Sequence, residues 1–132
     1  MICRRGQYLL CKRPDGKRHG GLWEFPGGKL ETGEDHFAAA KRELLEELSL
    51  KVTVCGDSLH SVADPQSPFI VDFVLTKVEG TPKLHEHQAL LWVNADELSS
   101  LALAPSDKKF VQERKEVLKE IAERNMESEI NE

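Results

Sequence analysis

The sequence predicts a single domain of the α/β or α+β class, because strand-like runs alternate with two amphipathic helical segments. The strand-like runs lie before residue 27 and between residues 51 and 93, and the helical segments lie at 35–48 and after residue 104. A chain of 132 residues can bury one sizeable core. We therefore expect one domain over residues 1–124, followed by a polar, acidic tail at 125–132 that is disordered.

The first third of the chain contains short strands separated by turns. Tyr8-Leu9-Leu10-Cys11 is a short apolar run typical of a strand, and Pro14-Asp15-Gly16 predicts a turn. Gly20-Gly21 breaks the chain before a second strand at residues 23–25. That strand ends at Pro26, because proline cannot donate a hydrogen bond to a sheet.

The next segment predicts a helix with an unusual acidic face. Asp35 is placed to cap the helix, and apolar residues recur at helical spacing as far as Leu48. Glu43, Glu46 and Glu47 share an arc of roughly 100° on the other side. Like charges so close repel one another, and a bound cation would remove that cost. Mg²⁺ prefers carboxylate oxygens together with substrate phosphates, so the face indicates phosphate chemistry, with an ordinary solvated helix face as the alternative.

The remaining chain supplies further strands and a closing helix. Residues 51–55 and 59–62 are strand-like, and residues 69–78 alternate so that one face is fully apolar, which predicts a central strand. Residues 90–93 predict another strand. The segment after Pro105 places apolar residues at helical spacing and predicts the last helix.

Composition excludes several classes of function. A formal net charge of −5 argues against a protein that binds nucleic acid polymers. No apolar run approaches ~18 residues, so we expect no membrane partner. Three cysteines without a C-x-x-C pair argue against a disulfide framework or a zinc site, and a cytoplasmic location fits them best. Residues 1–29 carry seven Lys or Arg against two acids, which predicts a basic rim beside the acidic face, as a metal-bound polyphosphate would need.

The spacing of residues 28–50 resembles a known family. Gly28, five residues, Glu34, seven residues and then Arg42-Glu43-Leu44-x-Glu46-Glu47 resemble the Nudix box, whose pattern is G-x5-E-x7-R-E-U-x-E-E-x-G-U with U aliphatic. Ser49 stands where the family has glycine just past the helix end, a place that commonly needs a left-handed backbone. Serine there should cost roughly 1 kcal/mol of local strain.

The resemblance extends beyond the box, over most of residues 2–118. Leu22-Trp23-Glu24-Phe25-Pro26-Gly27-Gly28, Trp92-Val93, Asp96-Glu97-Leu98 and Ala104-Pro105-Ser106-Asp107 are similar to the MutT branch of the family. The resemblance implies an α/β/α sandwich with a mixed β-sheet between helices.

The function implied by the resemblance is hydrolysis of a nucleoside triphosphate to monophosphate and pyrophosphate, with Mg²⁺ as cofactor and Mn²⁺ as the alternative metal. The first candidate activity is removal of 8-oxo-dGTP from the nucleotide pool, and hydrolysis of CTP or a modified dCTP is the alternative. Hydrolysis of another nucleoside diphosphate derivative, a non-catalytic nucleotide-binding module and an interaction protein remain open. The oligomer is expected to be a monomer or homodimer.

The metal ligands implied by the resemblance are Gly27, Glu43, Glu46, Glu47 and Glu86. Glu43 and Glu86 are the better candidates for the general base, and the sequence does not separate ligand from base. His85 and His87 alternate as a zinc pair can on a strand, but no further nitrogen or sulfur ligand accompanies them.

Two more residues of the box are implied in catalysis. Glu34 lies near the metals and helps to organise the attacking water, although an acid at this place would also suit the helix dipole. Arg42 pairs with a neighbouring carboxylate and orients it.

The substrate-binding residues implied are Arg13, Phe25, Gly28, Lys29 and Asp107. Phe25 either stacks on the base or belongs to the core. Asp107 lies beside the base pocket, where the MutT protein that removes 8-oxo-dGTP has asparagine. An ionised carboxylate only accepts hydrogen bonds, so it favours guanine, 8-oxoguanine or cytosine over uracil and thymine. Alternatively, Asp107 only stabilises the first turn of its helix.

Overall fold

The structure is a computed structural model that describes residues 1–27, 32–64, 68 and 70–130. In chain order its elements are β1 (Cys3–Arg4), β2 (Gln7–Lys12), β3 (Trp23–Glu24), α1 (His36–Leu48), β4 (Lys51–Ala63), β5 (Ile70–Glu79), β6 (Ala89–Asn94), the 3₁₀ helix η1 (Ala95–Ser100), α2 (Pro105–Glu113) and α3 (Lys115–Ile130).

Strand β2 is the centre of the larger sheet. It pairs antiparallel with β1, β3 and β6, while β4 and β5 form a separate antiparallel pair. Within the described residues, parallel pairing is limited to the bridges Ile2–Thr76, which joins the two sheets, and Trp23–Leu103. The two strands expected at 51–55 and 59–62 are one strand, β4, which absorbs the break through shifts of register against β5.

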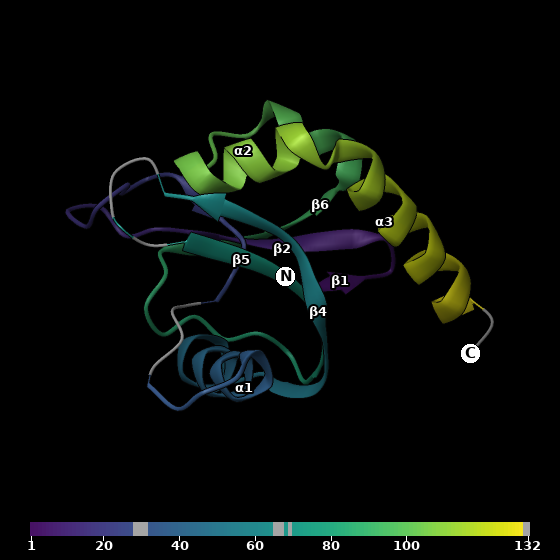
Figure 1. The fold of residues 1–132 in the computed structure, drawn as a ribbon, viewed down its shortest axis with the longest axis horizontal. Helices are drawn as coiled ribbons and strands as arrows, with labels where there is room; N and C mark the ends of the chain where they lie inside the picture. Colours follow the sequence, from purple (N-terminus) through teal and green to yellow (C-terminus); the bar gives the residue numbers. More distant parts are fainter. Residues whose placement is uncertain (28–31, 65–67, 69, 131–132) are drawn as a thin grey trace.

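The predicted sandwich is confirmed, since α1 covers one face of the strands and α2 and α3 cover the other (Figure 1). Strand β2 is buried on both sides, because its consecutive apolar side chains point in turn to the two faces of the sheet. Tyr8 and Leu10 pack in a core with residues of α2 and α3, and Leu9 and Cys11 pack in a second core with Leu44 of α1.

Helix α3 continues to Ile130, in place of the disordered tail that we expected from residue 125. Asn125 accepts a hydrogen bond from the backbone nitrogen of Gly6 at 2.8 Å and donates one to the carbonyl of Cys3 at 3.1 Å. These contacts join residues more than a hundred positions apart, which a local pattern does not reveal. None of the helices in the described part of the chain is long and apolar enough to cross a membrane.

Candidate active site

Helix α1 has defined ends that fix the direction of its side chains. The Asp35 carboxylate accepts a hydrogen bond from the backbone nitrogen of Ala38 at 2.8 Å, which confirms the predicted cap. At the other end Ser49 adopts the left-handed conformation, with φ 56° and ψ 33°, and its amide bonds the carbonyls of Leu44 and Leu45. Leu44 and Leu48, on the apolar side of the helix, enter the second core.

Arg42 connects this helix to the loop that precedes it. Its Nε and Nη2 donate to the two carboxylate oxygens of Glu34 at 2.8 and 2.9 Å, and its Nη1 donates to Glu43 at 2.7 Å. Glu46 lies 3.7 Å from the same Nη1. A planar guanidinium that grips one carboxylate with two bonds sets its orientation, so Arg42 pairs with neighbouring carboxylates as expected.

Glu47 is the buried member of the acidic face. The residue is only 8% exposed, and its Oε2 has no hydrogen-bond partner among the described residues, whereas the Glu46 side chain is 58% exposed. Burial, and after it the charges of the nearby Glu43, Glu24 and Glu86, together raise the pKa of Glu47 to about 8. An uncompensated buried acid is costly, so this position favours a bound cation.

Glu86 reaches the helix because its loop docks on the last turn of α1. The backbone nitrogen of Lys83 donates to the carbonyl of Leu48 at 2.8 Å, and that of His85 donates to the carbonyl of Glu47 at 3.3 Å. The charge of Glu86 thus acts on the Glu47 carboxyl. The structure therefore brings Glu86 near Glu43 and Glu47, which lie far from it in sequence.

Glu24 is an additional acid of this site that sequence reasoning missed. It lies on β3, accepts two bonds from Nη1 of Arg13 at 2.9 and 3.0 Å, and lies 3.5 Å from Nε2 of His87. A charged residue between two aromatic ones on a strand that runs into the box was the available signal. His87 therefore lies beside Glu24, whereas Nε2 of His85 lies 2.6 Å from Oγ of Ser49. The two histidines have different partners and do not form a zinc pair.

The acids suit a divalent cation that takes some of its ligands from the protein and the others from a substrate. Within the described residues, no three or more His, Cys, Asp or Glu side chains are arranged so that they alone could hold a metal ion. Mg²⁺ usually takes one or two carboxylates and completes its shell with phosphates and water. The unpartnered Oε2 of Glu47 and the neighbouring carboxylates fit that need.

A cavity of about 540 Å³ is lined by Glu24, the acid of β3 whose charge acts on Glu47. Strands β3 and β5, helix α1 and the start of α2 supply its walls, and Glu24, Gly27 and Asp107 all line it. Gly27 has a φ of +151°, which side chains rarely adopt. Gly28 and Lys29 lie outside the described residues.

Phe25 belongs chiefly to the core. It is 7% exposed and meets Tyr8, Phe73 and Phe110 edge to face. Its ring therefore offers little area to a base, although the residue borders the cavity. The core alternative describes its packing, and stacking on a base stays a prediction.

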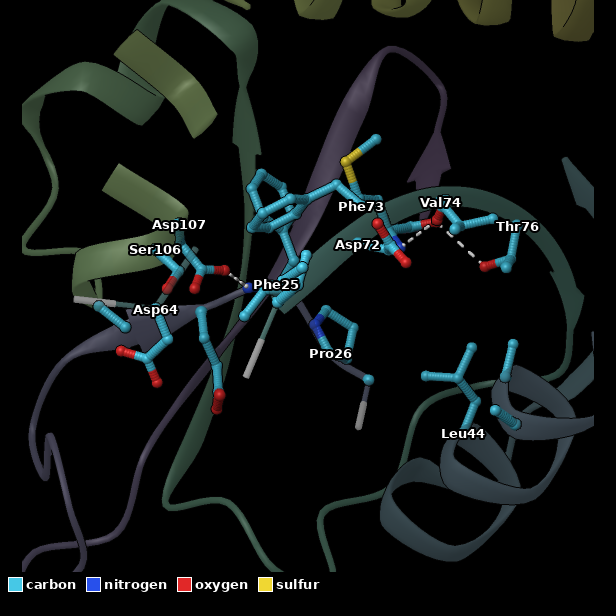
Figure 2. Close-up of a pocket in the computed structure, with 18 of the residues that line it drawn as sticks. Phe25, Pro26, Leu44, Asp64, Asp72, Phe73, Val74, Thr76, Ser106 and Asp107 are labelled. Carbon is cyan, nitrogen blue, oxygen red and sulfur yellow. Dashed lines mark hydrogen bonds between the residues drawn. The ribbon is translucent and has the colours of Figure 1, made fainter. Parts of the chain in front are cut away.

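Asp107 lines the cavity and binds the backbone of the residue that follows β3. Its Oδ2 accepts a hydrogen bond from the backbone nitrogen of Phe25 at 2.9 Å (Figure 2). The residue is 8% exposed, and burial raises the pKa of its carboxyl to about 7. The sequence favoured an ionised carboxylate at this position, but with this pKa part of the molecules hold a proton there near neutral pH. A protonated carboxyl can donate as well as accept.

Arg13 borders the same cavity but has protein partners. Besides the bonds to Glu24, its Nε donates to the carbonyl of Arg18 at 2.6 Å, and Arg18 lies 3.5 Å from Asp64. Positive groups therefore stand at the cavity, each beside an acid. Binding of a substrate by Arg13 stays a prediction.

The comparisons with known proteins identify the family. The model of the NUDIX domain matches residues 1–114, and the chain belongs to this family. It is MutT-like within the family. It is 41% identical over 110 residues to a CTP pyrophosphohydrolase of Escherichia coli, with 81% of each chain covered. It is 34% identical over 113 residues to a putative 8-oxo-dGTP diphosphatase 2 of Mycobacterium tuberculosis, covering 83% of this chain and 80% of that one. A crystal structure of the MutT protein from Methanosarcina mazei superposes with a TM-score of 0.74 at 27% identity, covering 89% of this chain and 88% of that one.

Proposed function

We propose that this protein hydrolyses nucleoside triphosphates to nucleoside monophosphate and pyrophosphate, with Mg²⁺ or Mn²⁺ as cofactor. The proposal is carried by the environment of Glu47, a buried carboxyl with an unpartnered oxygen among other acids, of which Glu24 also lines the cavity. The cation would neutralise charge on the substrate phosphates and on these carboxylates. Glu43, Glu46, Glu47 and Glu86 would hold it, with Gly27 close by.

The residues around the acids have distinct tasks in this reaction. Water attacks the β-phosphorus, the bond from that phosphorus to the bridging oxygen breaks, and the monophosphate leaves with that oxygen. A carboxylate takes the proton of the water. Glu43, which Arg42 orients, and Glu86, on the exposed loop, are the two candidates for this base. Glu34, fixed by two bonds to Arg42, helps to place the water.

We infer that Asp107 recognises the base. Its buried carboxyl borders the cavity, and as an acceptor it suits the donors of 8-oxoguanine or cytosine. The protein would then remove 8-oxo-dGTP from the nucleotide pool. CTP or a modified dCTP is the second candidate, because the 41% identical relative is a CTP pyrophosphohydrolase.

A substrate panel tests this proposal. Purified protein is assayed with natural and oxidised nucleoside triphosphates and with nucleoside diphosphate derivatives, in Mg²⁺, in Mn²⁺ and in EDTA, and both pyrophosphate and orthophosphate are measured. We expect pyrophosphate release that EDTA abolishes, led by 8-oxo-dGTP or a cytosine nucleotide. If only nucleoside diphosphate derivatives are hydrolysed, the protein has another activity of the family and is not a triphosphate pyrophosphohydrolase. Binding without any turnover would make it a non-catalytic nucleotide-binding module.

A further inference from the structure

Ser49, which replaces the family's glycine at the end of α1, makes a contact that glycine cannot make. Its Oγ lies 2.6 Å from Nε2 of His85, so the two side chains share a hydrogen bond. The serine holds the left-handed conformation with φ 56°, which is unfavourable for a residue with a Cβ. The hydroxyl contact thus accompanies a backbone conformation that glycine would adopt without strain.

His85 belongs to the loop between β5 and β6, which is fastened at two places. On one side the amides of Lys83 and His85 donate to the carbonyls of Leu48 and Glu47. On the other side the amide of Gln88 donates to the carbonyl of Lys12 at 2.9 Å. Glu86 is the exposed residue between these attachments. The placement of Glu86 relative to the Glu47 carboxyl therefore depends on how firmly residues 83–85 bind the end of α1.

We propose that Ser49 and His85 form a latch that positions Glu86 against the acidic face of α1. The latch rests on the proposed function, because Glu86 matters there as a metal ligand or base. Ser49 and His85 are positioning residues, since neither is assigned a contact with metal or substrate. The bond adds a side-chain attachment to the two backbone attachments of the loop.

The contrary view is that the hydroxyl only satisfies an exposed histidine at a helix end. The two views differ in their expectation for Ser49→Gly. Glycine relieves the left-handed strain, so melting temperature should stay equal or rise in both views. Only a latch predicts that the loop then loosens and that the response to metal weakens, although the protein is no less stable.

The test compares four single variants and the double variant Ser49→Gly with His85→Ala by two measurements. Ser49→Gly and His85→Ala remove the bond, Ser49→Asn tolerates the left-handed backbone and can bond His85 again, and Ser100→Ala removes an exposed serine hydroxyl bonded elsewhere, to the carbonyl of Glu97. Hydrogen exchange at the amides of Lys83 and His85 is measured in metal-free protein. The Mg²⁺ and Mn²⁺ concentrations for half-maximal hydrolysis are measured separately from kcat at saturating metal.

We expect exchange at both amides to accelerate about fivefold in Ser49→Gly and His85→Ala, the effect of losing one ordinary hydrogen bond. The half-maximal metal concentration should rise by a similar factor, with a smaller change in kcat. The double variant should be no worse than either single one. Ser49→Asn should restore most of the effect, and Ser100→Ala should match the parent.

Unchanged exchange and unchanged metal dependence in Ser49→Gly would overturn the latch. So would faster exchange without any change in metal dependence, because the loop would then not position Glu86. If the parent protein hydrolyses nothing, the proposed function fails, and hydrogen exchange together with direct Mn²⁺ binding still decides whether the bond holds the loop. The two failures are therefore distinguishable.

Discussion

Asp107 shows how burial changes the chemistry of a single carboxyl group. Its pKa rises from 3.8 to about 7, chiefly through burial, while the amide of Phe25 opposes the rise. Because the folded pKa lies above the unfolded one, the folded state binds more protons between these values. Stability therefore falls as pH rises from about 4 to about 7, and this loss is complete above that window.

Asp107→Asn should remove this loss, since the amide oxygen can still accept from Phe25 and carries no charge. We expect the melting temperature of the variant, relative to the parent, to be higher by a few degrees at pH 8 than at pH 5. Asp96→Asn, at an exposed acid, is the matched control and should show no such difference. A relative melting temperature that is equal at both pH values would place the charge of Asp107 in solvent.

The same variant tests base recognition. The amide adds a permanent donor, so Asp107→Asn should change the order of kcat/KM among UTP, CTP and 8-oxo-dGTP more than the overall rate. An unchanged order would leave Asp107 with the structural role of holding Phe25. Asp96→Asn again serves as the control.

Helix α1 is the element whose properties local sequence predicts best. The cap at Asp35 and the left-handed Ser49 are confirmed, and so is part of the apolar side, because Leu44 is buried in the second core. Two other apolar residues of the helix, Phe37 and Leu45, are exposed. The sequence could not distinguish Glu46 from Glu47, because helical angles do not show what covers each side. In the structure Glu47 is buried, with Glu24 of β3 and Glu86 of the loop at 81–88 nearby, whereas Glu46 is exposed.

Glu47→Gln tests the acidic face as a metal site. We expect turnover to fall by about two orders of magnitude or more, because a ligand's charge is lost. The metal-free melting temperature should stay equal or rise, since a buried acid among other acids has been neutralised. Glu46→Gln should also lose activity with little change in melting temperature, and Glu123→Gln, on the exposed side of α3, should change neither. A normal rate in Glu47→Gln would remove it from the metal site.

At the scale of the whole molecule, the layers were predictable and the long-range contacts were not. The uninterrupted apolar run of β2 and the two helical segments lead directly to a sheet covered on both faces. The basic rim was predicted by counting, but Arg13 pairs with Glu24, and Arg4 donates to the carbonyls of Val78 and Gly80. Such pairings depend on which strands meet, as does the packing of Phe25, so composition alone could not assign them.

The measurement that tests the central claim most directly is hydrolysis of the leading triphosphate in H₂¹⁸O with Mg²⁺, with the masses of both products determined. We expect nucleoside monophosphate without label and pyrophosphate carrying one ¹⁸O, formed only with a divalent cation and largely lost in Glu47→Gln. Label in the monophosphate would place the attack on the α-phosphorus. Labelled orthophosphate, or equal turnover in EDTA, would contradict a metal-assisted pyrophosphohydrolase built on the acidic face of α1.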